Sequence, residues 1–221
     1  MPVLTNPLRP LLLAAAGSAR LQRVVTGLPV SRAVVKRYVP GAGQDAVVAA
    51  TREILASGRA ISIDHLGEDT SDPDQAEATV QAYLDLLEAF GRLDVPARDG
   101  VPPLEVSLKL SALGQFIPEV GHDLALTNAR RVCRAAESVG AWVNVDAEDH
   151  TTTDSTLAIV AELRVDHPSV ATVLQAYLRR TEADCRALAT AGSRIRLCKG
   201  AYAEPADVAF QKSQEVDDSY R

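Results

Sequence analysis

The sequence predicts an α/β protein of the (β/α)8 barrel type, incomplete, with about five strand and helix units and helices at its N-terminal end. Short apolar runs rich in β-branched residues alternate with amphipathic helical stretches, which is typical of βαβ units and a parallel sheet. Within these runs one parity is apolar and the other polar, whereas strands of a doubly wound sheet are apolar on both faces. No GxGxxG turn follows the first run, so a dinucleotide-binding Rossmann fold loses its main support. A barrel whose strands end at a polar mouth fits this pattern better.

Two parts are expected along the 221 residues. Residues 1–43 form an N-terminal helical segment with six basic residues and no acidic one, closed by the Pro/Gly break of Tyr38–Gly43. Residues 44–221 form the partial barrel, which is acidic. The basic start is typical either of a cationic helix packed on an acidic body or of a segment that contacts a membrane surface.

The barrel elements follow in order, each with its own local signals. Asp72 directly before Pro73 predicts a helix start, and Gly140 and Gly192 predict helix ends. The expected strands are residues 59–65, 104–111, 141–149, 169–177 and 194–200, and the expected helices are residues 44–58, 72–93, 122–140, 153–166 and 181–192.

Polar side chains stand at the ends of all five expected strands. The carboxyl ends of barrel strands meet at one mouth, so these residues are expected to converge there. One by one they also have structural explanations, such as a buried ion pair between Lys109 and Asp146 or a loop cap by Asp64. An unpaired charge in a protein interior is unfavourable by several kcal/mol, so Arg196 in the last strand predicts an anionic ligand. The residues concerned are Asp64, Lys109, Asp146, Gln175, Arg196 and Lys199.

Four ordered motifs resemble the flavin-dependent proline dehydrogenases in their bacterial monofunctional form. They are VSLKLSALG, VNVDAEDH, TVLQAYLRRTEAD and IRLCKGAYAEP, and the resemblance runs from about Ile61 to Pro205. It implies a (β/α)8 barrel that holds FAD at its mouth and oxidises L-proline to Δ1-pyrroline-5-carboxylate. It also implies that the electrons pass to a membrane quinone.

The resemblance implies a role for each matching residue. Lys109 resembles the lysine that binds the proline carboxylate, and Asp146 the active-site aspartate beside the substrate. Arg196 would lie at the reactive locus of the flavin and stabilise its reduced form, so Asp146 and Arg196 are the expected catalytic residues. The expected cofactor-binding residues are Ala147, Gln175, Arg196, Lys199, Gly200 and Ala201.

The resemblance also implies three further units beyond the five, so we interpret the sequence as a C-terminally truncated product or a partial record. Five strands cannot close a barrel of this type. A chain of this extent on its own is therefore expected to bind FAD weakly at most. An inactive fragment is accordingly one alternative function.

A second alternative is a barrel enzyme in which Lys109 forms a Schiff base with a carbonyl substrate. A metal site is not expected, because neighbouring residues of the 146–150 segment point in different directions. The candidates weighed for it are Asp146, Glu148, Asp149 and His150.

The charge and the cysteine content limit which binding partners and which cellular compartment are expected. An acidic body without basic and aromatic interleaving does not favour nucleic acid. Three scattered cysteines with no CxxC pair favour a reducing compartment, so a cytoplasmic protein is expected. The membrane quinone that the resemblance implies adds an expected location at the periphery of the inner membrane. The expected small molecules are L-proline and a quinone.

Overall fold

The computed structural model describes residues 41, 43–93, 95, 100–190 and 192–221. The chain divides into two compact units, Met1–Thr51 and Arg52–Arg221. The expected N-terminal helical segment, residues 1–43, lies outside the described residues except for positions 41 and 43.

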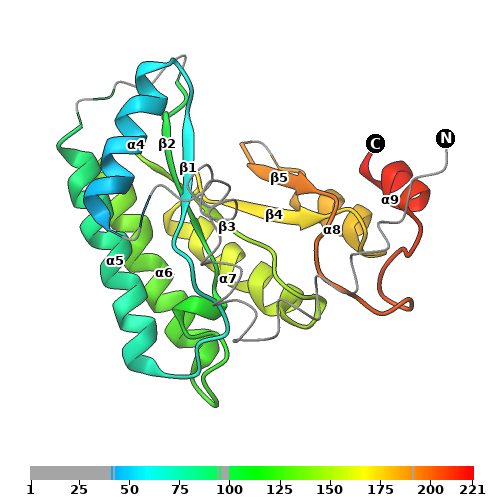
Figure 1. The fold of residues 1–221 in the computed structure, drawn as a ribbon. Helices are drawn as coiled ribbons and strands as arrows, with labels where there is room; N and C mark the ends of the chain where they lie inside the picture. The colour runs from blue at the N-terminus through cyan, green and yellow to red at the C-terminus, as the bar shows by residue number, and fades with distance from the viewer. Residues whose placement is uncertain (1–40, 42, 94, 96–99, 191) are drawn as a thin grey trace, which may run out of the picture. The chain divides into compact units, whose positions relative to one another are not determined.

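A five-stranded parallel sheet forms the centre of the second unit (Figure 1). Its strands pair in chain order, each with the next, as a barrel wall requires. All five fall within the strand segments expected from the sequence. They are β1 (Ile61–Asp64), β2 (Leu104–Leu108), β3 (Trp142–Val145), β4 (Ala171–Gln175) and β5 (Ile195–Cys198).

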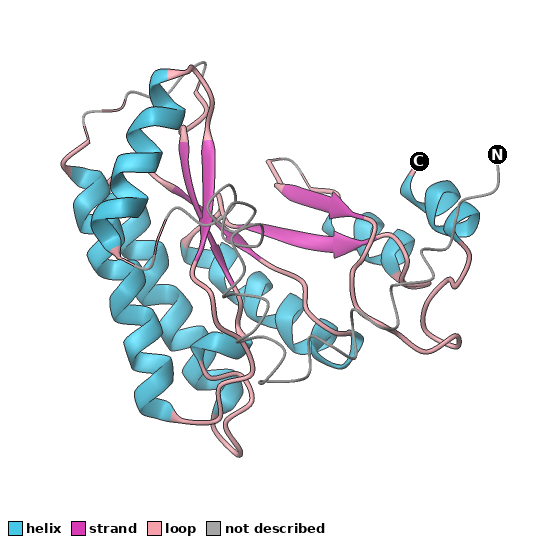
Figure 2. Cartoon of the chain, in the orientation of Figure 1, coloured by secondary structure: helices cyan, strands magenta, loops and turns pink. Residues whose placement is uncertain are grey.

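Helices alternate with the strands, and those between β1 and β5 lie along one side of the sheet (Figure 2). Within the described part of the chain, no helix is long and apolar enough to cross a membrane. The α-helices are α4 (Gln44–Ala56), α5 (Pro73–Gly91), α6 (Gly121–Ser138), α7 (Thr153–Asp166), α8 (Thr181–Leu188) and α9 (Ser213–Tyr220), with 3₁₀ turns at Ser111–Leu113 and His150–Thr152.

The strand register separates two faces of the sheet. Val106 of β2 pairs with Val143 of β3, and both are buried on the face that the helices cover. Ser107 pairs with Asn144 on the opposite face, which will be called the inner face. The alternation expected from the sequence is therefore present, and it directs polar side chains away from the helices.

Local signals explain where two of the elements begin and end. The carboxylate of Asp72 accepts a hydrogen bond from the backbone N–H of Asp74 at 2.9 Å, and Pro73 occupies the first turn of α5. Gly140 follows α6 with φ of +67°, a left-handed conformation that favours glycine. Both features were expected from the sequence.

Candidate active site

Arg196, on the inner face of β5, contacts side chains on or next to three other strands of the sheet. Its guanidinium NH2 lies 2.5 Å from Oε1 of Glu105 and 3.1 Å from Oγ of Ser62. Its NH1 lies 3.4 Å from Oδ1 of Asp146, just beyond β3. Side chains on or next to β1, β2, β3 and β5 thus meet on the inner face of the sheet. Ser62, Glu105 and Arg196 are each the second residue of their strands, so this contact lies below the carboxyl ends at which the sequence predicts the mouth.

Asp146 accepts one hydrogen bond from Ser107 of the neighbouring strand β2 and one from Asn144 of β3, the strand that Asp146 follows. Ser107 Oγ donates to its Oδ1 at 2.7 Å and Asn144 Nδ2 donates at 2.9 Å. Burial raises the pKa of Asp146, an effect that the Ser107 hydrogen bond and the positive charge of Arg196 only partly offset. The aspartate therefore binds protons more readily than an exposed carboxylate does.

Lys109 pairs with Asp64. The buried ion pair with Asp146 that the sequence offered as a structural explanation is not formed. The ammonium Nζ lies 2.7 Å from Oδ2 of Asp64. Burial alone lowers the pKa of Lys109, but the hydrogen bond and charge of Asp64 outweigh it, and the pKa lies above its ordinary value. Lys109 is therefore a firmly charged ammonium at the mouth.

Tyr83 of α5 reaches between the ends of β1 and β2. Its hydroxyl donates to the carbonyl of Ser107 at 2.6 Å and accepts the backbone N–H of His65 at 3.0 Å. One hydroxyl thereby satisfies a donor and an acceptor where the two strands separate. This arrangement fixes the strand ends that carry Asp64 and Lys109.

The structure corrects the expectation that Arg196 requires an anionic ligand. Arg196 is not an unpaired interior charge, because Glu105 and Asp146 both neutralise it and 41% of its side chain is exposed. Arg194 shares the same carboxylate, with NH2 at 2.6 Å from Oε2 of Glu105. The chain itself therefore supplies anions, and the arginines alone do not require an anionic ligand.

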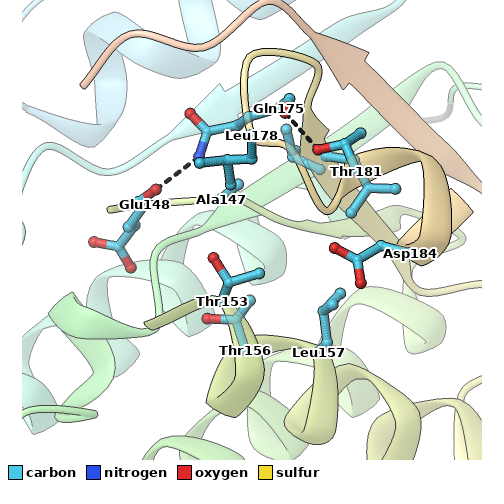
Figure 3. Close-up of a pocket in the computed structure, with 11 residues that line it drawn as sticks. Ala147, Glu148, Thr153, Thr156, Leu157, Gln175, Leu178, Thr181 and Asp184 are labelled. Carbon is cyan, nitrogen blue, oxygen red and sulfur yellow. Dashed lines mark hydrogen bonds between the residues drawn. The ribbon is translucent and has the colours of Figure 1, made fainter. Parts of the chain in front are cut away.

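Gln175 lies at the end of β4 beside a small cavity (Figure 3). Its Nε2 donates to the backbone carbonyl of Glu148 at 2.7 Å, and the residue is buried. Ala147 lines the same cavity, whose volume of about 10 Å³ holds at most one water molecule. Ala147 directly follows Asp146 in the chain and Gln175 ends the neighbouring strand β4, but this cavity is too small for a cofactor.

Lys199, Gly200 and Ala201 follow β5, and each has a distinct environment. The ammonium of Lys199 lies 2.5 Å from Oδ1 of Asp217 in α9, and 58% of its side chain is exposed. Gly200 has φ of +110°, and a Cβ there would lie 2.4 Å from the Tyr177 ring. Ala201 is exposed. The structure therefore does not bring these residues into contact with Arg196, which is the second residue of β5, while they follow the end of that strand.

Glu204 fixes the loop that follows these residues. Its side chain is 4% exposed, accepts the backbone N–H of His150 at 2.9 Å and forms an ion pair with the His150 ring. The Tyr177 hydroxyl donates to the same carboxylate at 3.3 Å. This buried acid ties the end of β5 to the segment after β3.

The four residues weighed as metal ligands face separate partners. Glu148 binds the hydroxyl and the backbone N–H of Ser111, and Asp149 caps the following turn through Thr151. Asp146 and His150 face the groups already described. Within the described residues, no group of three His, Cys, Asp or Glu is placed to hold a metal ion.

Sequence reasoning missed Glu105, although a signal for it exists. Glu105 shares its parity with Ser107 and Lys109, so a stricter reading of the alternation would have placed it on the inner face. Tyr83 and Glu204 carried no such signal, because a helix face and a loop do not reveal which strand ends they contact.

The described part of the chain is thus a partial β/α barrel with cationic and acidic side chains on the inner face of its sheet. The sequence profile of the proline dehydrogenase family matches residues 47–215, and the chain belongs to this family. It is 37% identical over 192 residues to proline dehydrogenase of Deinococcus radiodurans, covering 85% of this chain and 59% of that one. It is 29% identical over 191 residues to proline dehydrogenase 2 of Bacillus subtilis, covering 86% of this chain and 60% of that one. The chain thus spans about 60% of the length of these relatives.

Solved structures share the fold. Proline utilization A (PutA) from Bdellovibrio bacteriovorus, inactivated by N-propargylglycine, superposes with a TM-score of 0.76 at 21% identity, over 86% of this chain and 24% of that one. A PutA mutant from Bradyrhizobium japonicum gives a TM-score of 0.61 at 24% identity, over 74% of this chain and 20% of that one. These similarities confirm the expected fold class, an incomplete β/α barrel.

Proposed function

We propose that this chain takes part in the flavin-dependent oxidation of L-proline to Δ1-pyrroline-5-carboxylate, with electrons passed on to a quinone. The observation that carries the proposal is that Asp146 contacts Arg196 and lies within electrostatic reach of Lys109, in a chain of the proline dehydrogenase family. Its sequence relatives are named as proline dehydrogenases.

The groups at the mouth fit FAD as the cofactor. Arg196 and Lys199 are cationic donors with 41% and 58% of their side chains exposed, and guanidinium and ammonium groups suit a pyrophosphate and the electron-rich edge of a ring. Oδ1 of Asn144, buried on the inner face, lacks a hydrogen-bond partner among the described residues. Arg196, Lys199, Gly200 and Ala201 would hold the cofactor together with Ala147 and Gln175. Bound FAD would supply the hydride acceptor.

Lys109 and Asp146 would bind and orient the substrate. The charged Lys109 ammonium would bind the proline carboxylate, while Asp64, at 2.7 Å, keeps it in place. Asp146 would lie beside the proline amine, and Ser107 and Asn144 fix its carboxylate. Hydride can leave the carbon next to nitrogen only when that nitrogen is neutral, so the rate is expected to rise with pH from mildly acidic to alkaline conditions.

The Schiff-base alternative is disfavoured by the state of Lys109. A lysine nucleophile needs a neutral amine and hence a lowered pKa. The pKa of Lys109 is raised because Asp64 and neighbouring acids outweigh the effect of burial. Borohydride treatment in the presence of a carbonyl compound should therefore leave Lys109 unmodified.

We also propose a quinone as the electron acceptor and the cytoplasmic periphery of the inner membrane as the location. A quinone acceptor would place the protein in the cytoplasm, at the periphery of the inner membrane. Activity that is stimulated by vesicles containing quinone, relative to quinone-free vesicles, would support this part.

The test is a product assay on the purified chain with FAD in saturating excess and a soluble quinone. We expect L-proline, and not the same concentration of D-proline, to yield Δ1-pyrroline-5-carboxylate. Inactivation by N-propargylglycine would support the same site, since that reagent inactivates the PutA of Bdellovibrio bacteriovorus. No product at saturating FAD would contradict the function and favour an inactive fragment.

A further inference from the structure

The geometry points to Glu105 as the residue that positions Arg196 and moderates its charge. Glu105 lies on β2, three strands away from β5 in the order of the sheet, yet its carboxylate contacts Arg196 of β5 and Arg194 just before that strand. Glu105 therefore joins two strands, β2 and β5, that share no backbone hydrogen bonds. The part of the inference that concerns the flavin rests on the proposed function.

Both oxygens of Glu105 are engaged. Oε1 accepts from Arg196 at 2.5 Å and from the Ser62 hydroxyl at 2.8 Å, and Oε2 accepts from Arg194 at 2.6 Å. The side chain is only 15% exposed, so water screens these contacts less than at the surface. A carboxylate held by three donors has one defined position.

Arg194 serves as the anchor of this arrangement. Its guanidinium stacks 3.6 Å from the centroid of the Trp142 ring and donates to the carbonyl of Ser169 at 2.7 Å. Two groups besides Glu105 thus hold Arg194, and Arg194 in turn holds Glu105. The chain of contacts runs from the ring of Trp142 to the guanidinium of Arg196.

Glu105 and not Asp146 sets the position of Arg196. The distance from Arg196 to Glu105 is 2.5 Å, whereas the distances from its NH1 to Asp146 and to Ser107 Oγ are 3.4 and 3.3 Å. An ion pair at the shorter distance is the stronger one, and here it is also the less exposed. NH1 is consequently the side of the guanidinium that is free to change partners at the mouth.

The first test is a double-mutant cycle on the unfolding of the purified chain in urea, with Glu105→Gln and Arg196→Gln. We expect the pair to be coupled by at least about threefold in the folding equilibrium constant, more strongly than Asp146→Asn with Arg196→Gln. Additive effects of Glu105 and Arg196, or stronger coupling to Asp146, would overturn the inference. If the Glu105→Gln chain does not fold, Glu105→Asp keeps the charge but withdraws the carboxylate from Arg196, and a cycle of Glu105→Asp with Arg196→Gln is expected to show coupling of the same sign.

The second test is the reduction potential of FAD bound to the chain. Glu105→Gln removes a negative charge beside Arg196, so the potential should rise. Glu77→Gln is the matched control, because Glu77 pairs with Arg131 on the outer helices and loses the same charge. A shift no larger than that of the control would contradict the inference. A wild-type chain that does not oxidise proline would contradict the proposed function, while the cycle would still decide the role of Glu105.

Discussion

The hydroxyl of Tyr83 lies 2.6 Å from the carbonyl oxygen of Ser107 and joins α5 to the end of β2. The same hydroxyl accepts the N–H of His65, so its removal would take a partner from the buried carbonyl of Ser107 and from the partly buried N–H of His65. Tyr83 itself is 2% exposed, and water would not easily replace the lost group.

Tyr83→Phe should therefore destabilise the fold by about 1–3 kcal/mol. It should also raise the KM for proline, because the ends of β1 and β2 carry Asp64 and Lys109. Urea unfolding and steady-state kinetics measure the two effects. Tyr220→Phe on the exposed face of α9 is the control, and equal stability of the two variants would refute the role given to Tyr83.

Lys109→Met should weaken the binding of proline. A charge-assisted hydrogen bond contributes about 1.5–3 kcal/mol, so we expect KM for proline to rise about tenfold or more with a smaller change in kcat. Lys212→Met, at an ammonium whose side chain is 80% exposed, provides the control. A Lys109→Met variant with unchanged KM would show that another group binds the carboxylate.

Glu148 should make the stability of the fold depend on pH. Burial raises its pKa above the ordinary value of 4.5, and the hydrogen bonds from Ser111 offset this only in part. The protonated form thus adds stability that is fully present below pH 4.5 and is lost as the pH rises through the raised pKa.

Glu148→Gln should accordingly gain stability relative to wild type between about pH 4 and pH 7. Urea unfolding at both values measures this difference. The control is Glu88→Gln on the exposed surface of α5. A stability difference between the Glu148→Gln variant and wild type that does not change with pH would contradict the prediction.

Gly200→Ala should destabilise the fold by about 2–5 kcal/mol, since a left-handed alanine costs about 1–2 kcal/mol and overpacking about 1–3 kcal/mol. The added methyl group would lie 2.4 Å from the Tyr177 ring. Gly140→Ala is the matched control, because its φ is +67° but nothing lies within 4 Å of the new Cβ. Thermal unfolding of both variants separates the two effects, and equal losses would mean that the Tyr177 contact is unimportant.

The alternation of residues predicted much of the fold and part of the site. Five strands, their parallel order and the convergence of Asp64, Lys109, Asp146 and Arg196 all followed from parity and from the rule that strand ends share one edge. These are properties of the backbone, so a single sequence reveals them.

The partners of individual side chains could not be predicted in the same way. Lys109 pairs with Asp64 instead of Asp146, and Arg196 with Glu105, because reach across the inner face depends on the curvature of the sheet. The requirement for glycine at position 200 comes from the Tyr177 ring, which lies 23 residues earlier in the chain. Such contacts depend on tertiary packing, which alternation does not encode.

The most direct test of the central claim is the absorbance of FAD bound to the purified chain after anaerobic addition of L-proline. We predict that the oxidised flavin band bleaches with L-proline, and that Arg196→Gln and Asp146→Asn slow the bleaching while Arg186→Gln, on an exposed pair of α8, does not. A flavin band that L-proline leaves unchanged, with FAD shown to be bound, would contradict the claim that these strand ends form a proline-oxidising site.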